Sequence, residues 1–200
     1  MTSKKMNLSF KSLLAGAICA AAMSPVLSYA AETFAVDPAH TQTVFTIDHL
    51  GYSKVTGDFH DIKGEVLLDE QKPNDSSVDV TIGTSSIDTG LAARDDVLRS
   101  PAFFSVDKFP SISFKSTKVR KTGNKTADVL GDLTLLGVTK PVTLKVTFNR
   151  VAPDQMRGNA TVAGFTATGA IKRSDFGMKT YLPYIGDDVN LTLNFEGIKQ

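Results

Sequence analysis

Four charged side chains stand close together in the middle of this sequence: Arg94, Asp95, Asp96 and Arg99. An arginine can hold a phosphate through two parallel hydrogen bonds, so the cluster could orient a polar or phosphorylated group. It could equally form an Arg–Asp network that caps a short helix and ties it to its surroundings, and we favour this second interpretation. Asp95 and Asp96 would face apart on a helix, which makes them a poor pair for acid–base catalysis.

A second group of charges, Lys172, Arg173 and Asp175, allows the same two interpretations, and we again favour the structural one. The sequence contains no Gly-x-Ser-x-Gly elbow, no glycine-rich phosphate loop and no His-Glu-x-x-His pair. We therefore predict that the protein is not an enzyme. A hydrolase or isomerase that uses Asp95, Asp175 or His49 stays open as an alternative.

The three histidines, His40, His49 and His60, are the side chains best suited to a transition metal. They are nine and eleven residues apart, which places them on different strands or turns and not in a compact ligand motif. We predict no metal site, and we expect His49 to pack near the first turn with a hydrogen-bond partner.

Residues 1–30 have the pattern of a secretory signal peptide. Lysines precede an apolar run at residues 13–23, and Ser28 and Ala30 give the small-x-small pattern of a cleavage site. The apolar run is shorter than the roughly 20 residues that a membrane-spanning helix needs. We predict cleavage after Ala30, export to the periplasm, no stable membrane anchor and a single mature domain of residues 31–200.

The predicted mature chain has nearly balanced charge. Three lysines and no acid are lost with the leader, so 19 basic and 21 acidic residues remain and the net charge is −2. This balance gives no electrostatic reason to expect a nucleic acid partner or strong attachment to an anionic membrane. The single cysteine, Cys19, leaves with the leader, so the mature chain has no disulfide and no thiolate ligand.

The elements that must position these side chains are short strands. In the most regular of them, Val142, Leu144, Val146 and Phe148 alternate with polar residues. Turns rich in Gly, Pro and Asn separate this strand from similar runs at 41–50, 54–69, 78–83, 111–115, 129–136, 159–172 and 189–195. One apolar face in nearly every strand predicts an all-β fold, an up-and-down barrel of about eight strands in preference to two packed sheets.

Residues 87–114 interrupt this alternation with clustered apolar and charged side chains. Leu91, Arg94, Asp95 and Leu98 follow the spacing of one helix face, which predicts one or two helical turns. We expect the segment to form a short helical lid across one end of the barrel.

The ends of this helix can also be predicted. Asp88 or Thr89 could cap its first turn, because their side-chain oxygens can accept hydrogen bonds from free backbone N–H groups. Ser100 and Pro101 should end it, since the residue before a proline disfavours helical backbone angles.

Five ordered stretches resemble the YceI-like family of periplasmic lipid-binding proteins. Together they cover essentially the whole mature chain: DPAHTQTVFTIDHLGYSKVTGDF (37–59), IDTGLAARDDVLRSPAFFSVDKFPSISFKST (87–117), GDLTLLGVTKPVTLKV (131–146), AGFTATGAIKRSDFGMKT (163–180) and GDDVNLTLNFEG (186–197).

The resemblance implies a lipocalin-like, eight-stranded antiparallel β-barrel with an elongated apolar interior. It also implies binding of polyisoprenoid or other long-chain amphiphiles without catalysis and without a cofactor. Two positions depart from the pattern of the family: Val97 stands where a histidine is usual, and Ala102 where an acid often precedes the two phenylalanines. Both departures fall in the predicted lid.

An eight-stranded barrel can hold one ligand if small residues leave room inside it, and residues 160–170 are rich in alanine and glycine. The remaining interior would be lined mainly by bulky apolar side chains of the other strands and the lid. The candidate ligand-binding residues are Phe45, Ile47, His49, Phe59, Ile82, Arg94, Phe104, Phe114, Leu133, Leu135, Leu144, Val146 and Phe165.

Burial of a five-carbon isoprene unit could contribute up to about 4 kcal/mol before ordering costs, so a few units are enough for tight binding. We therefore predict a periplasmic carrier for a polyisoprenoid lipid or an isoprenoid quinone. The alternative is a stress-related structural or interaction protein whose barrel is filled by its own side chains. A homodimer is one arrangement that the sequence leaves open.

Overall fold

The computed structural model describes residues 1–2 and 30–200. The leader predicted at residues 1–30 therefore lies almost wholly outside the described residues. Within them, no helix is both long enough and apolar enough to cross a membrane.

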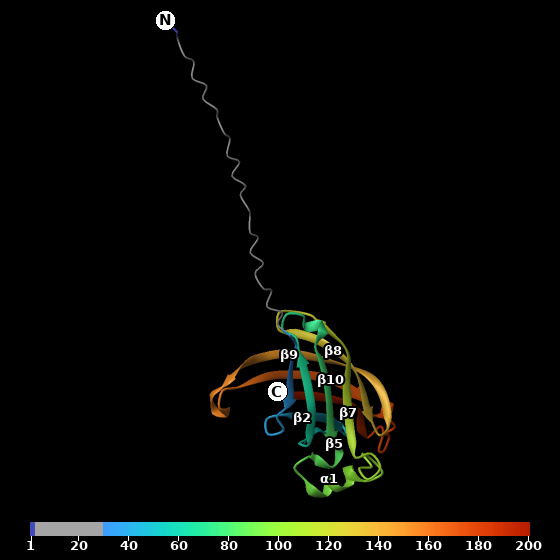
Figure 1. The fold of residues 1–200 in the computed structure, drawn as a ribbon. Coiled ribbons are helices and arrows are strands. Elements are labelled where there is room, and N and C mark those ends of the chain that lie inside the picture. The colour runs from blue at the N-terminus through green and yellow to red at the C-terminus, as the bar shows by residue number, and fades with distance from the viewer. Residues whose placement is uncertain (3–29) are drawn as a thin grey trace.

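Strands dominate the described part of the chain (Figure 1). They are β1 (Glu32–Val36), β2 (Gln42–His49), β3 (Ser53–Phe59), β4 (Ile62–Leu68), β5 (Ser77–Gly83), β6 (Ile87–Asp88), β7 (Ser111–Lys121), β8 (Thr126–Leu135), β9 (Val138–Asp154), β10 (Ala160–Lys172) and β11 (Ile185–Lys199). One α-helix, α1 (Ala92–Arg99), is found among these residues. Short 3₁₀ turns are η1 (Pro73–Asp75), η2 (Thr84–Ser86), η3 (Gln155–Arg157) and η4 (Arg173–Phe176).

The strands close into an eight-stranded antiparallel barrel. Eleven strands make eight because three of the barrel strands are each interrupted and so consist of two consecutive strands of the chain. β1 and β2 lie along the same edge of β11, β3 and β4 pair with β2 and β1, and β5 and β6 pair with β4 and β3. β7 to β11 follow as single strands, each paired with the next. The predicted fold class, a lipocalin-like up-and-down barrel with a short helix, is confirmed.

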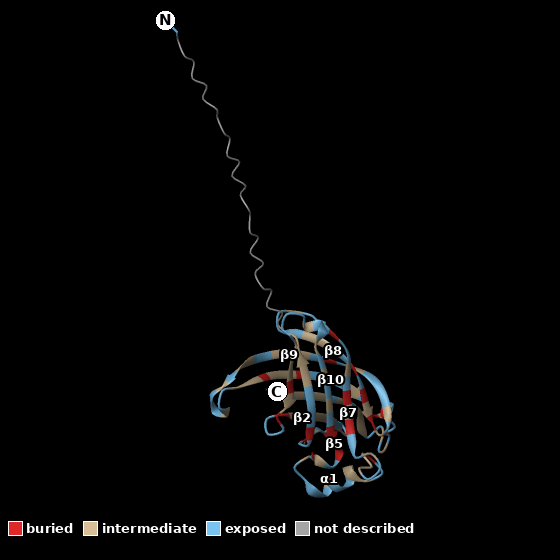
Figure 2. Ribbon diagram, viewed as in Figure 1, coloured by how far each residue is buried: buried red, intermediate tan, exposed pale blue. Residues whose placement is uncertain are grey.

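Alternation decides which side chains point inward. In β9, Leu144 is buried while Thr143 and Lys145 on either side of it are exposed, and the same pattern recurs around the barrel (Figure 2). Most of the buried apolar side chains form one cluster that runs through the barrel and reaches η4 through Phe176. A chain with one apolar side per strand can bury that side by closing the sheet on itself, and this chain does so.

Strand boundaries differ from the sequence prediction in several places. Residues 54–69, predicted as one strand, form β3 and β4, and β7 and β11 are longer than predicted. β1 was not predicted, because its five residues follow directly on the predicted leader. β9 starts at Val138 and includes Pro141, where a five-residue turn was expected. Proline has no backbone N–H to donate to a neighbouring strand. Pro141 is tolerated because β9 pairs at this point with β8 alone, so no hydrogen bond to β10 is required.

The lid helix is present, and Ser100 ends it as predicted. The predicted N-cap is wrong: Leu91 takes that position and no side chain caps the helix. Asp88 instead accepts a hydrogen bond from the N–H of Gly90, and Thr89 bonds to Asp95 within the helix. Both residues order the segment that leads into α1, which lies across one end of the barrel (Figure 1).

Gly64 in β4 generates a test of the packing between adjacent strands. Its φ is +132°, and a Cβ built there would lie 2.1 Å from the carbonyl oxygen of Asp79 in β5. Gly64→Ala should therefore lower the free energy of unfolding by about 3 kcal/mol, measured by denaturant titration.

Gly51→Ala is the matched control, since φ there is also positive at +72° but a Cβ would meet no atom within 4 Å. Gly51→Ala should lower the free energy of unfolding by only about 1 kcal/mol. Equal losses in the two variants would show that contact with β5 does not matter at Gly64.

Candidate functional site

The interior of the barrel is not filled by side chains. It encloses an elongated cavity of about 620 Å³, within the range of roughly 300–1,000 Å³ typical of ligand sites. Every residue predicted to contact a ligand lines this cavity: Phe45, Ile47, His49, Phe59, Ile82, Arg94, Phe104, Phe114, Leu133, Leu135, Leu144, Val146 and Phe165. The lining is therefore almost wholly apolar, apart from residues at its two ends.

Sequence reasoning missed a second set of lining residues on the same strands. They include Val55 in β3, Val66 in β4, Val78 and Val80 in β5, Val119 in β7, Val129 in β8, and Val189, Leu191, Leu193 and Phe195 in β11. The alternation that identified Leu144 in β9 marks these side chains equally well. The signal was therefore present in the sequence, and the prediction used only part of it.

Room inside the barrel is made differently from the prediction. Of the small residues in β10, only Ala167 lines the cavity. The carbonyl oxygen of Arg150 and the side chain of Asn149 lie near Gly164, and Ala170 is exposed, so these residues face outward. Gly169 faces Leu144, whose Cδ2 would lie 2.8 Å from a Cβ at that position.

Two glycines on other strands provide space for aromatic rings of the wall. A Cβ on Gly57 would lie 2.5 Å from Cζ of Phe45, its cross-strand partner, and a Cβ on Gly131 would lie 2.4 Å from Cζ of Phe114. Each ring thus occupies the space that a neighbouring side chain would otherwise take. The rings lie against the wall, and the centre of the barrel stays open.

The two ends of the cavity differ in chemistry. At the lid end its lining includes Val97, Leu98, Phe103 and Phe104, together with the polar residues Asp48, His49, Arg94 and Arg173. At the opposite end the lining is mainly polar and comes from η1, the turns and the adjoining strand ends: Glu70, Pro73, Ser76, Lys121, Gly123, Asn124, Lys125 and Thr126. Both ends of the cavity therefore offer polar groups, and an apolar tail would lie between them.

The lid charges serve mainly to hold the lid. Asp95 accepts hydrogen bonds from the backbone N–H (2.9 Å) and hydroxyl (2.6 Å) of Thr89. Arg94 donates to the hydroxyl and carbonyl oxygens of the same threonine, and Arg99 donates to the carbonyl oxygens of Ser85 and Ile87. The interpretation favoured from the sequence, a network that ties the helix to the rim, agrees with this geometry.

Comparison with known proteins identifies the family. Residues 34–197 match the YceI-like domain. The chain is 42% identical over 192 residues to Protein YceI of Shigella flexneri, which covers 95% of this chain and 98% of the relative. The chain belongs to the YceI-like family. The resemblance inferred from the five sequence stretches is therefore confirmed.

Solved structures share the YceI-like barrel. The Campylobacter jejuni YceI protein is 31% identical, with a TM-score of 0.66 over 77% of this chain and 90% of that one. Burkholderia cenocepacia BcnA is 23% identical, with a TM-score of 0.73 over 80% of this chain and 98% of that one. A polyisoprenoid binding domain from Saccharophagus degradans, implicated in plant cell wall breakdown, is 13% identical, with a TM-score of 0.63 over 85% and 99% of the two chains. The last two likenesses show the fold alone.

The second charged group in this YceI-like chain is also structural. Arg173 is buried and donates only to backbone carbonyl oxygens, those of Met178, Thr180, Ile185 and Gly186. Burial lowers the pKa of its guanidinium. The residue fastens the loop before β11 beside the cavity.

Asp187 holds the start of η4. Burial alone would raise its pKa, but hydrogen bonds from the hydroxyl and N–H of Ser174 and the charges of Lys172 and Arg173 lower it below its ordinary value. Asp175, a candidate for catalysis in the enzyme alternative, is exposed on the same turn.

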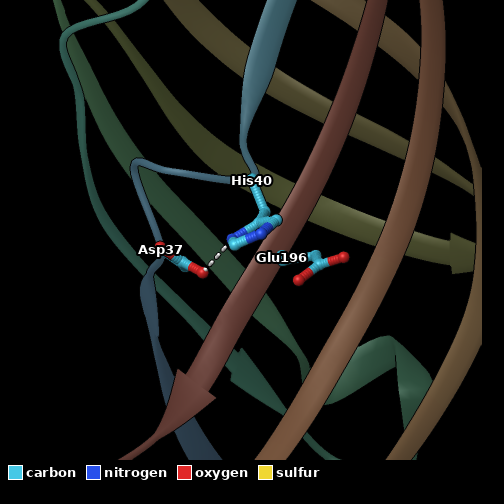
Figure 3. Close-up of side chains that lie close together, drawn as sticks. All are labelled: Asp37, His40 and Glu196. Carbon is cyan, nitrogen blue, oxygen red and sulfur yellow. Dashed lines mark hydrogen bonds and ion pairs between the residues drawn. The ribbon is translucent and has the colours of Figure 1, made fainter. Parts of the chain in front are cut away.

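The structure does not gather the three histidines. His49 ends β2 and lines the cavity, and His60 lies 3.1 Å from Asp58 in the break between β3 and β4. His40 lies with Asp37 in the turn before β2, opposite Glu196 of β11 (Figure 3). Local sequence patterns do not reveal this cluster, since Glu196 lies more than 150 residues from Asp37 and His40 in the chain.

The geometry of this cluster could suit a metal, but a cation of the protein already occupies its centre. Nη2 of Arg157 lies 2.8 Å from Asp37, 3.1 Å from Glu196 and 2.7 Å from His40 Nδ1. The arginine forms ion pairs with both carboxylates and ties η3 to the turn before β2 and to β11. We therefore interpret the cluster as a clamp between neighbouring segments of the barrel wall.

This clamp generates a prediction for acid stability. Burial raises the pKa of Asp37, but hydrogen bonds from His40 and Ala39 and the charge of Arg157 outweigh it and lower the pKa. A lowered pKa means that the ionised carboxyl stabilises the fold above the pKa of the unfolded chain, about 3.9. That contribution is lost as the pH falls through the lower folded value.

Asp37→Asn should therefore lower the free energy of unfolding by about 1 kcal/mol or more at neutral pH. The difference in this free energy between variant and wild type should shrink below about pH 4. Denaturant unfolding across the acid range measures it. A difference that stays constant from neutral to strongly acidic pH would contradict the role of the charge.

The wall geometry generates a second prediction. Gly57→Ala should push the ring of Phe45 into the cavity and weaken binding of an apolar fluorescent dye by about tenfold. A dye titration and a crystal structure of the variant would measure both effects. Gly158→Ala is the control, because a Cβ there meets no atom within 4 Å. Unchanged dye affinity with a displaced ring would disprove the proposed use of this glycine.

Proposed function

We propose that this YceI-like protein is an exported binding protein that shelters the tail of a polyisoprenoid lipid or isoprenoid quinone inside its barrel. The observation that carries the proposal is the apolar cavity of about 620 Å³. The likeness to a domain described as polyisoprenoid binding supports it, as does the leader pattern of residues 1–30.

The volume suggests the length of tail that fits. A carbon group fills roughly the volume of one water molecule in the liquid, about 30 Å³, so the cavity has room for on the order of twenty carbons, or about four isoprene units. At up to about 4 kcal/mol for each unit, such a tail would bind tightly after ordering costs. A longer tail would extend out of an end of the barrel.

The head group would lie at the lid end in this proposal. Arg94 lines the cavity there, and two of its three guanidinium nitrogens are engaged by Thr89, which leaves Nη1 without a partner among the described residues. That nitrogen can donate to a phosphate or carbonyl oxygen. The tail would then run from the lid into the apolar interior of the barrel.

Binding without catalysis is part of the proposal. The carboxylates considered for an enzyme are engaged elsewhere or lie outside the cavity: Asp95 is bonded to Thr89, and Asp175 does not line the interior. A barrel filled by its own side chains, the alternative from the sequence, does not fit the open interior.

Ala167 provides the test. It is buried in the wall between Val146 and Leu193, both of which line the cavity. Ala167→Phe should fill part of the space and raise the Kd for a polyprenyl phosphate by at least about tenfold, measured by calorimetry on the mature protein. Ala167→Leu should give a smaller effect in the same direction.

Ala170→Phe is the matched control, three residues along the same strand but exposed on the outer face. Its Kd should match wild type. If Ala167→Phe folds and binds the lipid as well as Ala170→Phe does, the tail does not occupy the cavity.

A further inference from the structure

Exposed large apolar side chains gather at the lid end of the barrel. Six of them lie on α1, on the turn between β2 and β3, or on the loop before β11: Leu50, Tyr52, Leu91, Val97, Tyr181 and Tyr184. Apart from Met1, only Leu130 and Met156 are comparably exposed elsewhere among the described residues. Single exposed apolar residues are ordinary, whereas a group of six at one end of a molecule marks an interaction surface.

Direct contacts join these segments into one rim. The hydroxyl of Thr180 donates to the carbonyl oxygen of Ala102 in the lid at 2.7 Å, and the rings of Phe103 and Tyr181 have centroids 6.1 Å apart. On the other side of the loop, the N–H of Leu50 donates to the carbonyl oxygen of Tyr184 at 2.9 Å. The lid, the loop and the hairpin turn therefore form a continuous surface.

This rim is continuous with the cavity. Val97 and Tyr181 both line the interior, yet they are 49% and 62% exposed. The same side chains thus belong to the inner wall and to the outer surface. An apolar tail could pass along them without first being surrounded by water.

The exposed charges of the rim that form no ion pair among the described residues are of both signs, with lysines in excess: Lys54, Lys108 and Lys179 against Asp107 and Asp175. Lys54 follows Tyr52 by two residues and Lys179 precedes Tyr181 by two, and both lysines are exposed and form no ion pair among the described residues. Two other acids near the rim are engaged in hydrogen bonds, since Asp48 accepts one from Gly51 and Asp187 accepts one from Ser174. Lysines beside tyrosines complement the phosphates and the interfacial layer of a phospholipid membrane.

We propose that the lid end is a docking surface for a phospholipid bilayer, on which the protein exchanges its ligand. The exchange step rests on the proposed function, whereas docking itself can be tested alone. Tyr52, Tyr184 and Leu50 enter the interfacial layer, the two lysines face lipid phosphates, and the mouth of the cavity opens onto the membrane. Contact is reversible, because six side chains on three short segments do not form a membrane span.

The absence of tryptophan from the sequence makes a site-specific reporter simple. Tyr52→Trp and Tyr184→Trp each place a single indole on the rim, and Met156→Trp places one on an equally exposed site away from it. Vesicles of phosphatidylethanolamine and phosphatidylglycerol should shift the emission of both rim indoles to shorter wavelength and leave the Met156→Trp indole unchanged. No shift at the rim, or the same shift at Met156→Trp, would overturn the proposal.

A double variant tests the contribution of the rings. Tyr52→Asp with Tyr184→Asp should weaken flotation with these vesicles by about tenfold. Neither residue lines the cavity, so the variant should still bind polyprenyl phosphate in solution, which also shows that it is folded. Flotation equal to wild type would overturn the proposal.

Docking and tail binding are separated by Ala167→Phe, which leaves the rim intact. The proposal expects this variant to float with vesicles as wild type does, even where it has lost the lipid. Vesicle binding that disappears along with tail binding would show that the membrane contact belongs to the bound lipid and not to the rim.

Discussion

Closure of the sheet by its last strand is the constraint on which the rest of the structure depends. One edge of β11 pairs with β10, and the other pairs first with β2 and then with β1. Because every strand of the barrel then has a neighbour on both sides, no long strand edge is left unpaired. All inward side chains therefore share one interior. The cavity, its lid and the clamp at Asp37 exist only in a sheet closed in this way.

A closed barrel could still be filled by its own side chains. This barrel stays open because of the way the side chains of its wall are placed. The rings of Phe45 and Phe114 lie over glycines of neighbouring strands and do not meet across the interior. The polar groups nearest the opening are meanwhile engaged with backbone atoms, as Arg173 illustrates with its four carbonyl acceptors. The interior is therefore apolar, open and bounded by a lid that is fixed at its base.

Much of the fold could be predicted from the sequence, because period-two alternation records directly which side chains face inward. The same record placed Leu144, Phe165 and the other predicted residues on the cavity. It also contained Leu191 and Leu193, which were overlooked. What alternation cannot reveal is the distance across the barrel, so the sequence attributed the free space to small residues of β10 when Gly57 and Gly131 accommodate the rings.

Contacts between distant parts of the chain could not be predicted either, because local sequence patterns do not show which segments meet in the folded protein. The N-cap of α1 was misplaced because Thr89 bonds to Asp95 and Arg94 in three dimensions, which a capping rule does not include. The clamp of Asp37 with Arg157 and the rim formed by Leu50, Tyr184 and the lid likewise depend on strand pairings set by closure. The sequence shows which kinds of side chain are present, whereas the closure of the sheet by β11 determines which of these side chains come into contact.

The central claim is that the interior holds an isoprenoid tail. Native mass spectrometry with lipid extraction, on mature protein taken gently from the periplasm, tests it most directly. The account predicts a stoichiometric added mass that fragments as an isoprenoid. A protein that carries no added mass, even after incubation with excess polyprenyl phosphate, would contradict it.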